Sequence, residues 1–154
     1  MAGKVLTWTN GFPGTVSRSI DDIIESIVNG ESTDSIAFGK PVALVNGAVQ
    51  NVSADNTNII GIAVRTIKTE ETYGGADPVY KAKEMVDVLK RGTVAVLVSN
   101  GSPAAGGTVH IVKATGAIRT SQDSTNTVEM TGWKFKGGKD ANNIAEIVLT
   151  ERKY

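Results

Sequence analysis

The stretch "MVDVLKRGTVAVLVSNG", residues 85–101, has the most regular pattern in the chain and indicates its fold class. Apolar and polar side chains alternate up to Arg91-Gly92, alternate again beyond this pair, and stop at Asn100-Gly101. A period of two is typical of a β-strand, and a glycine between two such runs is typical of a turn. The stretch therefore predicts a β-hairpin, and it carries no arrangement of residues typical of a catalytic or metal site.

The composition of the whole chain also favours β-structure. Among its 154 residues are 18 Val, 13 Ile and 16 Thr, against only 5 Leu. Branched side chains fit a pleated sheet and lose rotamer freedom on a helix. The length is typical of one domain, which buries roughly two thirds of the surface that its unfolded chain exposes.

Charge, cysteine content and hydropathy exclude several classes of function. Sixteen basic residues balance sixteen acidic ones, so no net charge attracts the chain to nucleic acid or to an anionic membrane. No cysteine is present, which excludes disulfides, thiolate zinc sites and cysteine nucleophiles. No apolar run is long enough to span a bilayer, and the start lacks the core of a signal peptide. We therefore expect cytoplasmic synthesis and no membrane partner.

The first 18 residues have little periodicity but include Trp8, Phe12 and the pair Pro13-Gly14. We interpret residues 1–18 as an extended arm, which could reach about 60 Å when fully stretched. The alternative is that Trp8 and Phe12 fold back over the core of their own domain.

The next segment, "SIDDIIESIVNG" at residues 19–30, has a helical pattern. Isoleucines occur at i, i+3, i+4 and i+7, namely Ile20, Ile23, Ile24 and Ile27. Ser19 is placed to cap the N-terminus, and Asn29-Gly30 could end the helix. The pattern predicts a short helix at about residues 20–28, packed on the sheet or on a partner.

From about residue 38 the chain alternates between strand patterns and turn signals. The strand candidates are residues 40–45, 48–52, 58–68, 85–90, 93–99, 108–113, 116–120, 127–135 and 144–151. Asn46-Gly47 predicts a tight hairpin, Gly132 predicts a β-bulge, and residues 70–83 predict an exposed loop. Residues 19–154 are therefore expected to form a single, mainly β domain, an antiparallel β-barrel or a jelly-roll-like sandwich.

Two features superficially suggest a phosphate-binding or a catalytic site. "GSPAAGGT", residues 101–108, has P-loop-like glycine spacing, but Gly107 stands where that loop needs lysine, and a strand follows instead of a helix. His110 is the only histidine and lies within the strand pattern "TVHIVK". We interpret the first as an ordinary loop and the second as a histidine on a strand face.

The acidic and basic groupings also have structural explanations. The pairs Asp21/Asp22 and Glu70/Glu71 are typical of a helix start and of a solvated loop. "DNTN" at Asp55 and "DANN" at Asp140 lack the central glycine and the final glutamate of a calcium loop, so they indicate turns. The aromatics of "GWKFKGGK", residues 132–139, are more typical of a core strand than of a nucleic-acid site.

Five stretches carry a resemblance to a known family: "GFPGTVSRSIDD", "FGKPVALVNGAV", "NIIGIAVRT", "VDVLKRGTVAVLV" and "GKDANNIAEIVLT". In order and approximate spacing the chain resembles the structural cement, or capsid decoration, proteins of tailed bacteriophages. The similarity extends over residues 11–150, and residues 66–83 match the family least.

The resemblance implies a virion structural protein on the outer capsid surface, made in the cytoplasm of a bacterial host. It would form a homo-oligomer, a dimer or a trimer, that bridges major capsid proteins and stabilises the expanded head. Trp8, Phe12 and Arg18 of the arm are the expected capsid contacts, since aromatic residues and arginine commonly dominate interfaces. No catalytic residue, cofactor, metal or nucleic-acid partner is expected.

Two other functions compete with this one. A small β-barrel on the virion surface could bind a ligand or a glycan, which requires a concave pocket with convergent polar and aromatic groups. An enzyme such as a small hydrolase is a weaker candidate because the chain has no cysteine, a single histidine and no recognisable nucleophile setting.

Overall fold

The computed structural model describes residues 9–17, 21–66, 79–151 and 154, and within them the chain forms eleven strands. The strands are β1 (Ile23–Val28), β2 (Ile36–Ala37), β3 (Pro41–Val45), β4 (Ala48–Asn51), β5 (Ile59–Ala63), β6 (Val79–Tyr80), β7 (Met85–Asn100), β8 (Thr108–Val112), β9 (Ile118–Arg119), β10 (Thr127–Phe135) and β11 (Ile144–Leu149). In this part of the chain no helix is long and apolar enough to cross a membrane.

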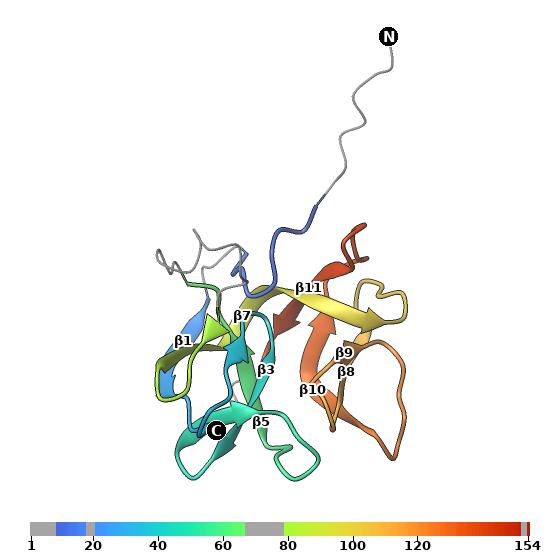
Figure 1. Ribbon diagram of the computed structural model, residues 1–154. Coiled ribbons are helices and arrows are strands. Elements are labelled where there is room, and N and C mark those ends of the chain that lie inside the picture. The colour runs from blue at the N-terminus through green and yellow to red at the C-terminus, as the bar shows by residue number, and fades with distance from the viewer. Residues whose placement is uncertain (1–8, 18–20, 67–78, 152–153) are drawn as a thin grey trace.

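The strands form two lobes that share β7 (Figure 1). The first half of β7 pairs with β1 and β5, and its second half pairs with β11 and β9. We call the unit of β1, β3, β4, β5 and the first half of β7 the N-terminal lobe. The unit of the second half of β7 with β8 to β11 is the C-terminal barrel.

The C-terminal barrel is a closed ring of five strands. Its order is β7, β11, β10, β8 and β9, and β9 returns to β7. The pairing of β9 with β7 is parallel, whereas the other pairs in the ring are antiparallel. The predicted β-barrel is therefore confirmed, with one parallel pair that an antiparallel barrel would lack.

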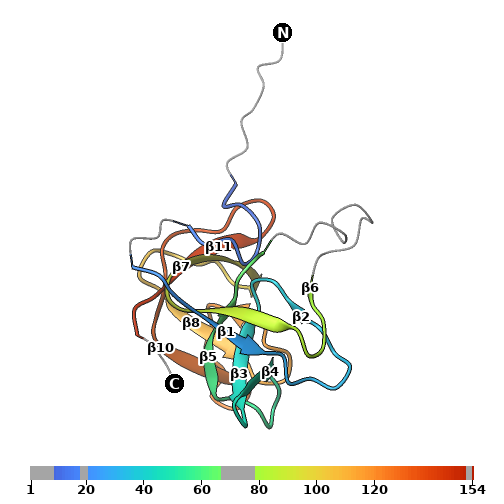
Figure 2. The same cartoon turned by 90° about the vertical axis from the view of Figure 1, so that its left-hand side faces the viewer.

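Asn29, the residue after β1, connects several segments of the N-terminal lobe through hydrogen bonds. Asn29 forms an isolated parallel bridge with Val49 of β4, and the Gly30 N–H donates to the Val49 carbonyl at 2.8 Å. The Asn29 side chain is fully buried and donates to the backbone carbonyls of Tyr80 and Lys81. β1 and β4 therefore meet at one end of this lobe, beside the small β2–β6 sheet (Figure 2).

The core consists of two hydrophobic clusters that meet at β5. Ile59 and Ile62 belong to a large cluster that fills the C-terminal barrel around Trp133 and Phe135. Ile60 belongs to a smaller cluster within the N-terminal lobe. Every residue of β5 is buried, as in a strand that is covered on both faces.

The predicted helix at about residues 20–28 is wrong, because residues 23–28 form the strand β1. Their side chains alternate between half-buried and exposed, and β1 pairs antiparallel with the first half of β7. Ile23 and Ile27 are four residues apart, a spacing that puts two side chains on one face of a strand as well as of a helix. The hydrogen bonds to β7 and the preference of isoleucine and valine for sheets decide between the two structures.

The predicted hairpin at residues 85–101 is also wrong, since β7 is one strand of sixteen residues. Gly92 lies at a positive φ of 128°, which lets the strand change direction between the lobes without reversing. The change of alternation around Arg91-Gly92 therefore marks a passage between two sheets.

Other local predictions are confirmed. Asn46 and Gly47 have φ values of 51° and 80°, the positive pair required by the tight hairpin that joins β3 to β4. Gly132 lies at φ 78° where the pairing of β10 with β8 shifts register, as a bulge requires. The predicted exposed loop at residues 70–83 is not among them: residues up to 78 lie outside the described residues, and the prediction is wrong at Val79–Tyr80, which form β6 with Tyr80 buried.

Within the described part of the predicted arm, residues 9–17, residues 14–17 lie along the second half of β7. Gly14 donates to the Ala95 carbonyl at 2.8 Å, Ala95 donates back to Thr15 at 2.9 Å, and Ser17 donates to Thr93 at 2.9 Å. Val16 packs against the core of the C-terminal barrel. This segment therefore forms part of the β-structure up to residue 17.

Candidate functional site

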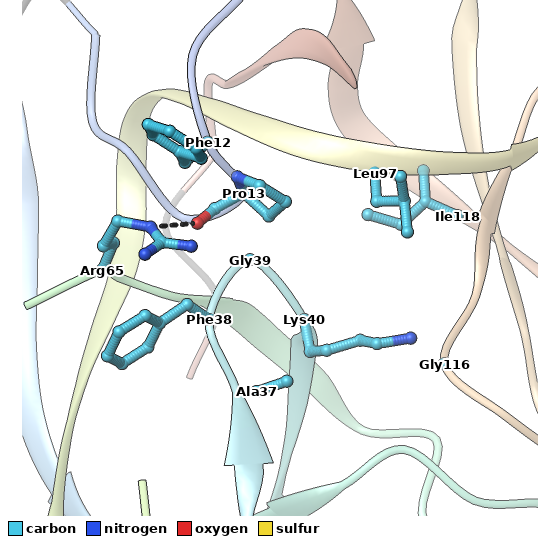
Figure 3. A pocket seen from close by; sticks show the side chains of 10 residues that line it. All are labelled: Phe12, Pro13, Ala37, Phe38, Gly39, Lys40, Arg65, Leu97, Gly116 and Ile118. Atoms are coloured by element: carbon cyan, nitrogen blue, oxygen red, sulfur yellow. Dashed lines mark hydrogen bonds between the residues drawn. The ribbon is translucent and has the colours of Figure 1, made fainter. Parts of the chain in front are cut away.

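A pocket of about 240 Å³ lies where the two lobes meet (Figure 3). It is lined by Phe12, Pro13, Ala37, Phe38, Gly39, Lys40, Arg65, Leu97, Gly116 and Ile118. These residues come from the N-terminal segment, the β2–β3 turn, the segment after β5, the β7 strand, and β9 with the turn before it. Four of the five stretches that carry the family resemblance therefore meet at one place.

Two glycines allow this close approach. Gly14 and Gly39 lie at φ 83° and 77°, and a Cβ atom on either one would come within 2.8 Å of the other's backbone nitrogen. Gly14 accepts a hydrogen bond from the Arg65 N–H at 2.8 Å, and Gly39 donates to the Ala63 carbonyl at 2.8 Å. Residues far apart in sequence are therefore joined through the backbone at the base of the pocket.

Arg65 is stacked between two aromatic rings in one wall of the pocket. Its Cζ atom lies 5.2 Å from the centroid of Phe12 and 5.2 Å from that of Phe38, and its Nε donates to the Pro13 carbonyl at 3.1 Å. The stack is visible in Figure 3, where Arg65 lies between the two rings. Cation–π contacts of this kind hold the plane of the guanidinium group.

Phe38 is in turn supported from inside the N-terminal lobe. Its ring meets Tyr80 edge-on, with 5.1 Å between the centroids. The Tyr80 hydroxyl donates to the Val64 carbonyl at 2.7 Å. Burial raises the pKa of Tyr80 above its ordinary value, so the hydroxyl remains a donor even in mildly alkaline solution.

The three residues predicted to contact a capsid have different outcomes. Phe12 lies at the rim of the pocket, is 67% exposed, and belongs to neither core cluster. Trp8 and Arg18 lie outside the described residues, so their role stays a prediction. The sequence interpretation missed Phe38, Lys40, Arg65 and Leu97, because no spacing pattern connects them before the chain folds.

The residues that the sequence analysis considered as catalytic or ligand-binding candidates have structural roles. His110 lies on β8, is buried, and faces Arg119 of β9 and Glu129 of β10 across the sheet, which confirms a histidine on a strand face. Trp133 and Phe135 are core residues, as expected. Residues 101–107 form a loop that leads into the strand β8.

Asp140 confirms the interpretation of "DANN" as a turn. Burial by itself would raise the pKa of this carboxyl, but backbone N–H groups of Asn10, Ile144 and Asn142 donate to it and lower the pKa below its ordinary value. The Asn10 side chain also donates to the Ile144 carbonyl at 2.6 Å. Asp140 therefore ties the N-terminal segment to the start of β11.

The acidic pair at the start of β1 also has a structural setting. Asp21 forms an ion pair with Arg91 at 2.7 Å, and Asp22 lies against Gly92. Glu70 and Glu71 lie outside the described residues, and Asp55 is exposed in the turn before β5. Among the described residues, no group of three or more acidic or histidine side chains could hold a metal ion.

Comparisons with known proteins agree with this picture. Residues 5–150 match the model of the family described as "Structural cement protein (E217 gp24/Pam3 gp6)". A chain of a solved structure, "The capsid of Myoviridae Phage XM1", is 18% identical and has a TM-score of 0.79, over 99% of this chain and 98% of that one. A comparison with curated proteins found no match.

The fold, the pocket and the family match define the class of protein: a β-barrel structural protein of a bacteriophage particle. The chain belongs to the phage structural cement protein family. Family membership implies a virion location and association with capsid proteins, and the likeness to the XM1 chain shows that the fold is shared.

Proposed function

We propose that this protein binds the outer face of the phage capsid as a small homo-oligomer, a dimer or a trimer, and bridges neighbouring major capsid proteins. The observation that carries the proposal is the match to the cement family over residues 5–150. Cementing needs complementary surfaces and no catalysis. The pocket described above agrees with such a role, since it lies at the surface between the lobes and the described residues of its lining include no acid–base pair.

Stabilisation of the expanded head follows from linkage. A ligand that binds only the expanded shell stabilises that state by mass action, and many copies on one particle add their contributions. Interfaces of about 800 Å² per partner are therefore sufficient for each copy.

In this proposal residues 1–18 act as a strap, that is, an arm that extends over the neighbouring shell protein. Residues 19–154 form the β domain to which this arm is attached. The anchoring of residues 14–17 along β7 and of Asn10 to Asp140 supports this division of roles, because it fixes the segment on both sides of the exposed ring of Phe12. Trp8, Phe12 and Arg18 are the proposed shell contacts.

The test is sedimentation of the purified chain with heads assembled from the major capsid protein of the same phage. We expect binding to expanded heads, no binding to unexpanded ones, and a dimer or trimer by sedimentation equilibrium. The double variant Trp8→Ala, Phe12→Ala should bind more weakly while its circular dichroism and melting temperature stay close to those of the wild type. Equal binding to both forms of the head, or to neither, would contradict the proposal, and wild-type binding by the double variant would contradict the strap.

A further inference from the structure

The described lining of the pocket between the lobes carries positive charge that no acidic side chain of that described lining balances. Lys40 and Arg65 are the only charged residues among the described residues that line it. Neither forms an ion pair with a described residue. Since the whole chain has no net charge, this local imbalance is a property of the pocket and not of the composition.

The guanidinium group of Arg65 is oriented before any partner arrives. Phe12 and Phe38 hold its two faces, and its Nε donates to Pro13. Its two terminal nitrogens form no hydrogen bond with the described residues. A planar guanidinium with free terminal N–H groups matches the geometry of a carboxylate, to which it can donate two parallel hydrogen bonds.

The rest of the lining suits an apolar group beside that carboxylate. Leu97 is 48% exposed and Phe12 is 67% exposed, although most large apolar side chains of the described residues are buried. In Figure 3 the side chain of Lys40 extends across the pocket, opposite Leu97 and Ile118. The volume of about 240 Å³ is below the range typical of small-molecule sites, roughly 300–1,000 Å³, and suits one or two side chains of a peptide.

We propose that this pocket docks a segment of the shell protein in which an aspartate or glutamate stands beside an apolar side chain. The carboxylate would bind the terminal N–H groups of Arg65, Lys40 would add positive charge across the pocket, and the apolar side chain would pack on Phe12 and Leu97. This inference rests on the proposed function, since it names the contact through which the protein would hold the shell. Charge complementarity selects an acidic segment over a basic or a neutral one.

Charge reversal at Lys40 is the sharpest test, because Lys40 has no described side-chain partner whose loss would unfold the chain. Affinity for expanded heads would be measured by sedimentation for the wild type, Lys40→Glu and Lys134→Glu. Lys134 is the matched control: it is exposed on β10, lines no part of the pocket, and contacts the Thr108 hydroxyl, which can also donate to a glutamate. We expect Lys40→Glu to bind about tenfold more weakly or worse, and Lys134→Glu to bind like the wild type.

Two further measurements distinguish a failure of this inference from a failure of the proposed function. Leu97→Ser should weaken binding without changing its salt dependence, whereas Lys40→Glu should reduce that dependence. Wild-type affinity of both pocket variants would overturn the inference and leave the proposed function standing, whereas a wild-type chain that binds no heads would overturn both. If Lys40→Glu instead dissociates an oligomer of the free protein, the pocket belongs to an interface between copies of this chain, and the shell segment is the wrong occupant.

Discussion

Gly92 shows how one residue determines the course of the chain through both lobes. It lies in the middle of β7 at φ 128°, a conformation that residues with a Cβ atom rarely adopt. A Cβ atom at this position would also overlap the Asp22 carboxylate, which is packed against the bend. Both the backbone angle and the space around it therefore require glycine.

Gly92→Ala should destabilise the protein by about 1–3 kcal/mol, because backbone strain and the overlap with Asp22 act together. Urea unfolding followed by circular dichroism would measure the loss. Gly137→Ala is the control: Gly137 has no positive φ, and no atom lies within 4 Å of the place that its Cβ would occupy, so the effect should stay within about 0.5 kcal/mol. Equal stabilities of the two variants would show that the bend tolerates a side chain.

At the scale of elements, β1 is attached to β7 by two ion pairs in different surroundings. Glu25 contacts Lys90 at 2.7 Å, and the Lys90 side chain is only 5% exposed. Asp21 contacts Arg91 at the same distance, but both of those side chains are well exposed. A charge buried without its partner is costly, whereas an exposed charge is solvated by water.

Glu25→Gln should therefore cost roughly 2–3 kcal/mol, somewhat less than for a fully buried pair, because water reaches the glutamate. Asp21→Asn should cost about 0–1 kcal/mol. Guanidinium is unsuitable as the denaturant because it screens both pairs, so thermal unfolding in low salt is the measurement. The hypothesis fails if the two variants lose the same stability.

The sequence predicted those elements whose determinants are local. Asn46-Gly47 has the conformational freedom that a two-residue hairpin needs, and Gly132 has the freedom that a bulge needs, so both positions were identifiable. The helix at residues 20–28 was predicted because the isoleucine spacing satisfies two periods at once. Only pairing with β7, more than fifty residues further along the chain, decides in favour of a strand.

Of the residues that line the candidate site, only Phe12 at its rim was predicted from the sequence as a contact residue. Phe12 attracts notice as an aromatic residue in a segment of little periodicity, and it does line the pocket. Phe38, Lys40 and Arg65 follow ordinary strand and turn patterns, and their proximity arises from the contact between Gly14 and Gly39. A sequence of one chain contains no local signal for that contact.

At the scale of the molecule, the two lobes share the strand β7, and the larger hydrophobic cluster extends from the barrel onto β3 and β5 of the N-terminal lobe. Val86 and Val88 in β7 belong to the cluster of the N-terminal lobe, and Val94 and Val96 belong to that of the barrel. Disorder in one lobe would therefore remove pairing partners from the other. This arrangement predicts one cooperative unfolding transition.

Ile60→Ala tests that cooperativity, because Ile60 is fully buried in the cluster of the N-terminal lobe. The substitution should cost about 2–5 kcal/mol. In a Trp8→Phe background, the fluorescence of Trp133 reports on the core of the other lobe. We expect its urea midpoint to fall together with the midpoint from far-ultraviolet circular dichroism, and an unchanged Trp133 midpoint would mean that the lobes unfold independently.

The continuity of β7 also has a mechanical consequence. A force that pulls the N-terminal lobe away from the barrel acts along a covalent backbone, and neither lobe can slide away without shearing a row of strand hydrogen bonds on each side. Rows sheared in parallel resist tension better than bonds that peel open one at a time. A molecule built in this way transmits tension from one lobe to the other through a continuous strand, with no flexible linker between them.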